Sequence, residues 1–128
     1  MDEKRLDDYL TEIKRYHQLI ERVPEEDKVT RINLLSKQLV FIGRLASYFA
    51  EQNKRVYATR KRVYSETYLD ATKHKAHVAE LAVVDLREEE AEAYGNFKRW
   101  SNAFESTREE INALKYKVKI DFADGSSN

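Results

Sequence analysis

The sequence predicts an all-α fold: a short N-terminal helix followed by a long antiparallel helical hairpin with coiled-coil-like packing. Three observations predict it. The 128 residues include only three glycines and one proline, too few to supply the turns of a β-rich or loop-rich fold. Apolar residues recur at steps of three and four over long stretches, as on one face of a helix. Charged residues make up 36% of the chain, against about a quarter in an ordinary domain.

The first predicted helix covers residues 2–22. Its apolar face advances by alternating steps of four and three and consists of Leu6, Leu10, Ile13, His17 and Ile20. His17 is therefore expected in the core or at its boundary. Pro24 ends this helix, since it disfavours the α region for the preceding residue. The same proline suits the first turn of a second helix, where Glu25, Glu26 and Asp27 would face the positive end of the helix dipole.

The second predicted helix covers residues 24–71. Its first half, residues 29–49, carries apolar residues on two sides, so it is expected to contact two neighbours, one of them the first helix. Gly43 lies inside this half and costs about 1 kcal/mol relative to alanine in a helix. The preferred explanation for a glycine at this position is that another helix packs closely against it.

The third predicted helix covers residues 76–115, within an apolar pattern that alternates steps of four and three from Ala79 to Val118. This period of 3.5 is typical of coiled-coil-like packing. Trp100, flanked by Phe97 and Phe104, is expected in the densest part of the core.

The join between the two long helices, residues 70–77, holds neither glycine nor proline. One continuous helix from Pro24 to Val118 is therefore an alternative. Charge placement favours a hairpin that turns near Lys73, because a basic block then lies opposite an acidic one. The basic block consists of Lys54, Arg55, Arg60, Lys61 and Arg62. The acidic block consists of Asp85, Glu88, Glu89, Glu90 and Glu92.

Residues 114–122 alternate apolar and polar side chains strictly, which is also the pattern of a half-buried strand. Because the chain offers no partner strand, such a strand would have to pair with another chain. The helix and the strand both stay open. Residues 123–128 are expected to form a disordered tail, and residues 1–122 a single helical domain that assembles into an oligomeric bundle.

Composition and motifs argue against a catalytic site in this chain. No catalytic constellation, phosphate-binding glycine loop or nucleophile elbow is present. His74 and His77 have a spacing that can bind a metal, but cysteine is absent and the nearest acids are Asp70 and Glu80. We expect no enzyme activity, cofactor or metal. The charged N-terminus and the lack of a long apolar stretch lead us to expect a cytoplasmic protein without a membrane segment.

One stretch, residues 54–75, combines cations with tyrosines. Phosphate neutralisation plus stacking is what single-stranded nucleic acid requires. The competing and favoured interpretation is that the cations face the acidic block while the tyrosines pack inside the hairpin. The candidate contact residues are Lys54, Arg55, Arg60, Lys61, Arg62, Lys73, Lys75, Tyr57, Tyr64 and Tyr68.

Three segments carry a family resemblance: RKRVYSETYLDAT, AHVAELAVVDLREEEAEAY and NFKRWSNAFESTREEINALK. In helical spacing and residue class they resemble small helical-hairpin proteins of tailed-phage early gene clusters, encoded near single-strand-annealing recombinases and replication genes. Such proteins often have glycine at the hairpin turn, and this chain does not. The resemblance implies a phage origin, residence in the host cytoplasm and an accessory role in DNA metabolism. It carries over no catalytic residue.

The leading hypothesis is thus a non-enzymatic helical interaction protein that binds itself and a protein partner, beside DNA recombination or replication proteins. One alternative is a direct single-stranded nucleic-acid binder that uses residues 54–75. Another is a structural or scaffold-type assembly protein. Nucleic acid is the less favoured partner, and no membrane partner is expected.

Overall fold

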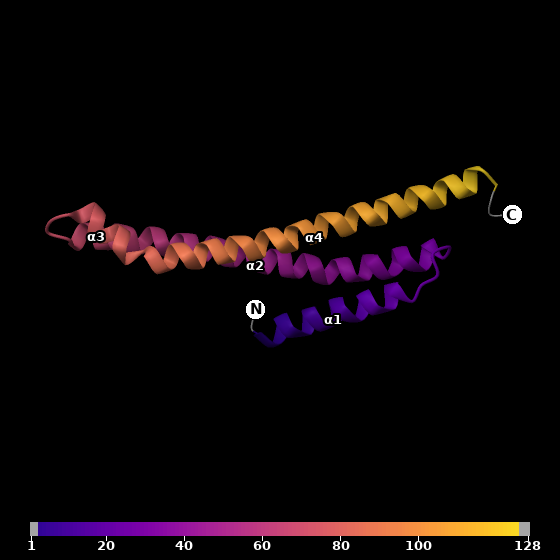
Figure 1. Ribbon diagram of the computed structural model, residues 1–128, viewed down its shortest axis with the longest axis horizontal. Helices are drawn as coiled ribbons and strands as arrows, with labels where there is room; N and C mark the ends of the chain where they lie inside the picture. The colour runs from indigo at the N-terminus through magenta and orange to yellow at the C-terminus, as the bar shows by residue number, and fades with distance from the viewer. Residues whose placement is uncertain (1–2, 126–128) are drawn as a thin grey trace. The chain divides into compact units, whose positions relative to one another are not determined.

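A computed structural model describes residues 3–125. It contains four helices: α1 (Glu3–Glu21), α2 (Lys28–Asp70), α3 (Lys75–Ala82) and α4 (Val84–Ala123) (Figure 1). The described part of the chain has no strand, and the long helices α2 and α4 pack against each other, so the predicted all-α helical hairpin is confirmed.

Within the predicted domain, 1–122, the chain forms two compact units. The three-helix unit contains the described residues up to Ala46 and from Trp100 onward, and the hairpin unit contains Ser47–Arg99.

The connection from α1 to α2 corrects the predicted role of Pro24. The backbone N–H of Asp27 donates to the Pro24 carbonyl at 3.0 Å, which closes a turn, and α2 begins only at Lys28. Asp27 caps the helix, because its Oδ1 accepts a hydrogen bond from the Thr30 backbone N–H at 3.2 Å. The prediction that α2 starts at Pro24 is therefore wrong. Proline, which lacks an N–H, fits both the turn before α2 and the first turn of a helix. An aspartate can accept a hydrogen bond from an unpaired N–H of the first turn only from the cap position.

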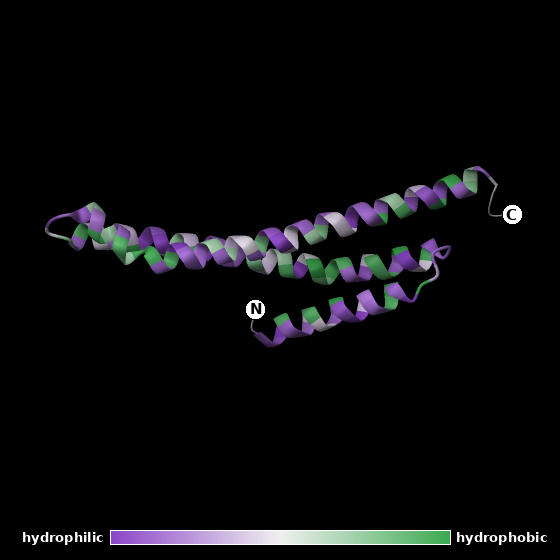
Figure 2. Ribbon diagram, viewed as in Figure 1, coloured by the Kyte–Doolittle hydropathy of each residue, from purple (hydrophilic) through white to green (hydrophobic). Residues whose placement is uncertain are grey.

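In the three-helix unit, α1 lies beside the first part of α2 (Figure 1), and its hydrophobic residues lie along the side that faces α2 (Figure 2). A buried cluster takes one residue from each helix of this unit: Ile20 from α1, Leu35 from α2 and Ile111 from α4. The Gln38 amide is buried and donates to the Ile13 carbonyl at 3.0 Å, which fixes α1 against α2 without an unsatisfied polar group. The two neighbours predicted for residues 29–49 are thus α1 and α4.

His17 does not belong to this core. Its side chain is 66% exposed, and its Nε2 lies 3.0 Å from Glu21 Oε1. The core prediction for His17 is wrong, because the apolar face of α1 is completed by the tyrosines beside it. Tyr9 and Tyr16 both pack on Phe41, with ring centroids 5.9 and 6.1 Å apart.

Close packing at Gly43 is observed: a Cβ built there would lie 3.1 Å from Phe104 Cε2. Trp100 is only half-buried, so the prediction that it marks the densest part of the core is wrong. The most buried large side chain of this unit is instead Leu45, which is 1% exposed. Aromatic size alone did not locate the core, because a wide ring at the seam leaves one edge open to solvent.

The hairpin unit turns at residues 71–74, at the predicted place, which excludes a continuous helix. His74 adopts the left-handed conformation, with φ 53° and ψ 39°. This is the conformation that glycine adopts at low cost, so His74 occupies the place of the turn glycine. The chain reverses without a glycine because histidine tolerates this region better than most residues.

The predicted third helix is interrupted. The sequence predicts an unbroken helix over residues 76–115. Val83, however, leaves the helical conformation, with φ −110° and ψ 8°, and separates α3 from α4. Val83 is fully buried, as is Ala79. Ala79 and Val83, two positions of the predicted apolar pattern, therefore stay buried in the hairpin although the helix is interrupted at Val83. Nothing in the sequence around Val83 marks the break.

The C-terminal helix continues through residues 114–122, so the strand alternative is wrong there. Lys28 Nζ lies 3.3 Å from Asp121 Oδ2, and Leu114 and Val118 are half-buried at helical spacing. These contacts hold the segment as helix despite its alternating pattern. The helix ends at Ala123, where Gly125, with φ 67°, donates its N–H to the Phe122 carbonyl at 3.2 Å. Of the predicted disordered tail, residues 126–128 lie outside the described residues.

Candidate nucleic-acid and partner interface

All ten candidate contact residues lie in the hairpin unit, but the fold does not use them alike. Arg60 crosses to α4, where its Nε donates to Glu90 Oε2 at 2.9 Å, and the two side chains are only 15% and 25% exposed. This hydrogen bond raises the pKa of the Arg60 guanidinium further above its ordinary value. Arg60 therefore links α2 to α4 and is not free to bind a ligand.

The other cations do not cross to the acidic block. Arg55 lies over Glu51 of its own helix, with the guanidinium 2.5 Å from the carboxylate. Lys54, Arg62 and Lys73 are exposed, and within residues 3–125 they form no ion pair. The favoured interpretation, in which the acidic block neutralises the basic one, thus holds for Arg60 and fails for these three residues. The reason is that both blocks extend around their helices, and only one side of each faces the other.

The acidic residues are distributed in the same way. Glu90 is half-buried against Arg60, while the other members of the block are exposed and form no ion pair within the described chain. Spacings of three and four place Asp85, Glu88 and Glu92 on one side of α4. That side carries an unneutralised negative surface.

The tyrosines are divided between packing and exposure. Tyr64 and Tyr68 stack, with ring centroids 6.3 Å apart and planes at 23°. Tyr68 is 42% exposed and Tyr57 47% exposed, so neither is packed inside the hairpin as the favoured interpretation expected. Cations lie over their rings: Arg60 and Lys61 are 5.2 and 5.4 Å from the centre of Tyr57.

A groove of about 440 Å³ runs between α2 and α4 in this unit, and we call it the tyrosine groove. It joins Lys54 and Tyr57 to two residues of α4 that sequence reasoning missed, Arg87 and Tyr94. Tyr94 is 51% exposed, and Arg87 pairs with Glu80 at 3.0 Å. Tyr94 was overlooked because it lies one position outside the regular apolar seam, next to Ala93. The lining consists of Asn53, Lys54, Tyr57, Arg87, Glu90, Ala91 and Tyr94.

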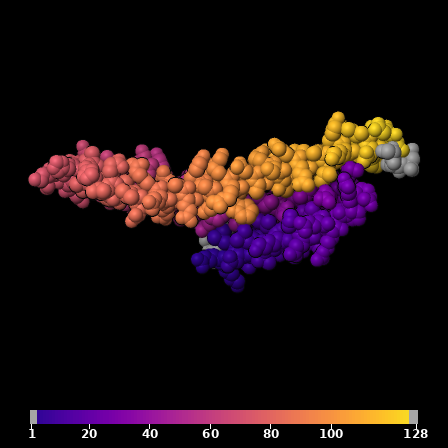
Figure 3. All heavy atoms as spheres, in the orientation of Figure 1, coloured from indigo at the N-terminus to yellow at the C-terminus, as the bar shows by residue number. Residues whose placement is uncertain are grey.

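Large apolar side chains are exposed at the closed end of the hairpin unit, where hydrophobic ribbon is visible on α3 and the adjoining part of α4 (Figure 2). Figure 3 shows the same segments in space-filling form. Leu69 and Leu81 are 76% and 62% exposed, and Val84 and Val78 are 46% and 39% exposed. We call these four residues the tip cluster. Lys73 and Lys75 flank it, and Lys75 Nζ lies 5.8 Å from the ring centre of Tyr68.

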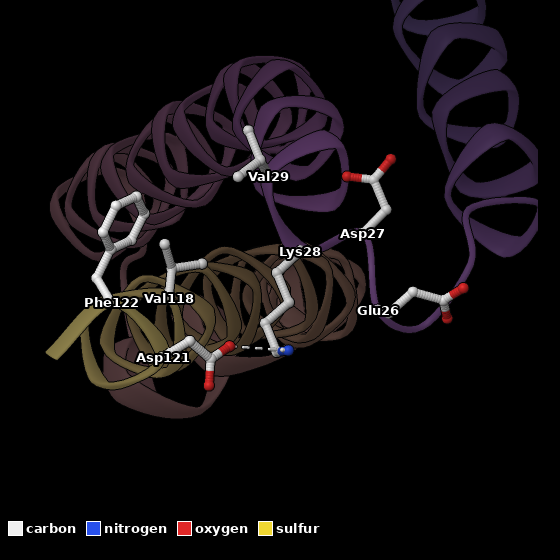
Figure 4. Close-up of a pocket in the computed structure, with 7 residues that line it drawn as sticks. All are labelled: Glu26, Asp27, Lys28, Val29, Val118, Asp121 and Phe122. Atoms are coloured by element: carbon white, nitrogen blue, oxygen red, sulfur yellow. Dashed lines mark hydrogen bonds and ion pairs between the residues drawn. The ribbon is translucent and has the colours of Figure 1, made fainter. Parts of the chain in front are cut away.

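The three-helix unit has an open groove of its own, of about 410 Å³, between the start of α2 and the end of α4. Val29, Val118 and Phe122 line its apolar side, while Lys28 reaches across to Asp121 (Figure 4). Val29 and Phe122 are 67% and 73% exposed. None of the ten candidate contact residues lies here.

Within residues 3–125 no group of three or more metal-ligating side chains is placed to hold an ion. None of the described helices combines the length and apolar character that crossing a bilayer requires. Comparison of the chain with protein-family models, curated proteins and solved structures found no significant match.

Proposed function

We propose that this protein acts by binding and not by catalysis, as a helical interaction protein that associates with itself and with a protein partner. The observation that carries the proposal is the balance of its apolar side chains. Among the described residues, thirteen large hydrophobic side chains are exposed and eight hydrophobic residues are buried. Folding of one chain alone therefore leaves much of the apolar surface in water, at a cost of about 25 cal/mol per Å².

The tip cluster is the part of this surface on which the proposal depends most. Scattered single apolar residues on the surface are normal, whereas a contiguous apolar patch marks an interaction site. Leu69 lies in the last turn of α2, Val78 and Leu81 lie on α3, and Val84 begins α4. Three short segments thus present apolar side chains at one end of one unit.

The proposed setting is the accessory machinery of phage DNA recombination or replication. This setting is supported by the resemblance of residues 55–114 to helical-hairpin proteins, and no family match adds to that support. A scaffold role in assembly would use the same kind of surface, so the identity of the bound protein separates the two.

Site-specific photocrosslinking in the cells that express the protein tests this proposal. A photoreactive phenylalanine analogue replaces Leu69 or Leu81, and the matched control replaces Glu66, which is exposed one turn earlier on α2. We expect discrete protein adducts from the two tip positions only, including adducts to a second copy. A recombinase or replication protein in the other adducts supports the accessory role, and a capsid protein supports the scaffold role. Equal patterns from tip and control positions would refute binding through the tip cluster.

A second function, direct binding of single-stranded nucleic acid, is favoured by one specific observation. The exposed Tyr57 and Tyr94 and the unpaired Lys54 meet at the tyrosine groove. Asp85, Glu88 and Glu92 lie on another side of α4. A labelled oligonucleotide that is retained at low salt and released at high salt would support this function. No retention at low salt would exclude it.

A further inference from the structure

The tyrosine groove has two aromatic side chains on opposite walls. Tyr57 comes from α2 and Tyr94 from α4, and about half of each side chain is exposed. Tyr94 contacts Phe97, with ring centroids 6.4 Å apart and planes at 63°. Arg60 and Lys61 lie over the ring of Tyr57. Both rings are thus positioned by neighbours while their outer parts remain free for contact.

Charge around the groove is arranged by sign. Lys54 lines it, and Lys61 stands one turn after Tyr57 on the same side of α2. On α4, Lys98 stands one turn after Tyr94 and is exposed. The one carboxylate that lines the groove, Glu90, is bound to Arg60. The groove therefore combines flanking positive charge with an internally neutralised acid.

Three other members of the acidic block lie on a different side of α4 from Glu90. Asp85, Glu88 and Glu92 share a side of α4 that contributes no residue to the groove. A polyanion that follows the groove is thus separated from them by the width of the helix. The same arrangement does not suit a second copy of this groove, because the lysines at its rim would meet lysines.

We propose that the tyrosine groove binds single-stranded nucleic acid, with an unpaired base stacked on Tyr57 and Tyr94 and the neighbouring phosphates on Lys54 and Lys61. The proposal deepens the second function given above and names its site. Aromatic stacking is tolerant of sequence, because every base has a π-face, and lysines contact phosphates as point charges. Binding is accordingly insensitive to sequence and sensitive to salt.

The test uses the full chain and an oligothymidylate that carries one 2-aminopurine, whose fluorescence is quenched on stacking. Wild-type protein is expected to bind at low salt with quenching. Tyr57→Ala with Tyr94→Ala should weaken binding roughly 5- to 150-fold for each stacked base lost and abolish the quenching. Tyr57→Phe with Tyr94→Phe should bind like wild type, because stacking needs the ring and not the hydroxyl. Since both tyrosines are about half exposed, circular dichroism should show unchanged helix content in both double variants.

A matched pair of charge variants tests the phosphate contacts. Lys54→Gln should reduce the slope of log affinity against log salt by about 0.7, the value for one phosphate of a single strand. Arg62→Gln removes a cation that is also exposed and unpaired, from a side of α2 that does not line the groove, so its slope should match wild type.

Three outcomes overturn the proposal in different ways. No binding of the oligonucleotide by wild-type protein excludes both the site and the second function. Full binding by the double alanine variant excludes the groove and leaves nucleic-acid binding elsewhere on the chain. Equal competition by a duplex of the same length excludes recognition of an unpaired base. Competition by a single-stranded RNA agrees with the proposal, since the stacking and phosphate contacts are the same.

Discussion

Gly43 is the position where the packing of α2 on α4 can be tested most directly. It lies inside a helix, where alanine is favoured over glycine by about 0.8–1.0 kcal/mol. A Cβ added at Gly43, however, would meet Phe104 Cε2 at 3.1 Å and Cδ2 at 3.4 Å. Carbon atoms attract each other best at about 3.5–4.0 Å, so the ring would have to move by a few tenths of an ångström.

The surroundings of Phe104 decide the sign of the effect. The ring is half-buried, and the Arg108 guanidinium lies 5.8 Å from its centre. Overpacking in such a place costs about 1–3 kcal/mol, which cancels or exceeds the gain in helix propensity. We therefore expect Gly43→Ala to change the free energy of unfolding by between about zero and a loss of 2 kcal/mol.

Gly95 provides the matched control, because it also lies inside a helix but its added Cβ meets only the flexible end of Arg99, at 3.7 Å. Gly95→Ala should stabilise the protein by up to about 1 kcal/mol. Urea denaturation followed by circular dichroism, at one protein concentration, measures both variants. Adding Phe104→Leu to Gly43→Ala should recover part of the loss. Equal stabilisation by the two alanine variants would refute the close approach of Phe104 to Gly43.

Three further predictions follow from individual contacts. Leu45→Ala should cost about 2–5 kcal/mol in urea denaturation, because Leu45 is 1% exposed, while Leu69→Ala, at an exposed position, should cost less than about 0.5 kcal/mol; similar losses would contradict the assignment of the core. His74→Gly should raise the melting temperature, since glycine adopts the φ of 53° without the steric cost that histidine bears, and a fall would show that the histidine side chain stabilises the turn. Hydrogen bonds from Thr30, first from its hydroxyl and then from its backbone N–H, lower the pKa of the Asp27 carboxyl. The stabilisation from this cap is therefore complete above the unfolded pKa of about 3.9 and is lost as the pH falls through the lower folded pKa, so Asp27→Ala should destabilise at pH 7 and have no effect in acid; a pH-independent effect would contradict this account.

The sequence alone determined the fold class, the hairpin and the position of its turn. Long runs of apolar residues at steps of three and four leave little choice but helix, and two complementary charge blocks favour folding back over a continuous rod. Gly43 was also identified correctly, because a glycine inside a strong helical pattern needs a packing reason. These features depend on residues close together in the chain, or on simple pairing of two long segments.

Only the tertiary structure decided the details that depend on which side of a helix meets a neighbour. Residues 114–122 fit a helix and a strand equally well by pattern, and contacts to the start of α2, such as Lys28 with Asp121, select the helix. The break at Val83 has no local signal in the sequence, since valine is neither a glycine nor a proline and does not mark the end of a helix.

The same reason explains the candidate site. The sequence of residues 54–75 does not reveal that Arg60 is bound to Glu90. It also does not reveal that Lys54 lines the same groove as Tyr57 without forming an ion pair within the described chain. It could not include Tyr94, which comes from the other helix. The side of a helix on which a residue lies follows from sequence, but what stands opposite that side follows only from how the helices pack, and charge and stacking act across that short distance.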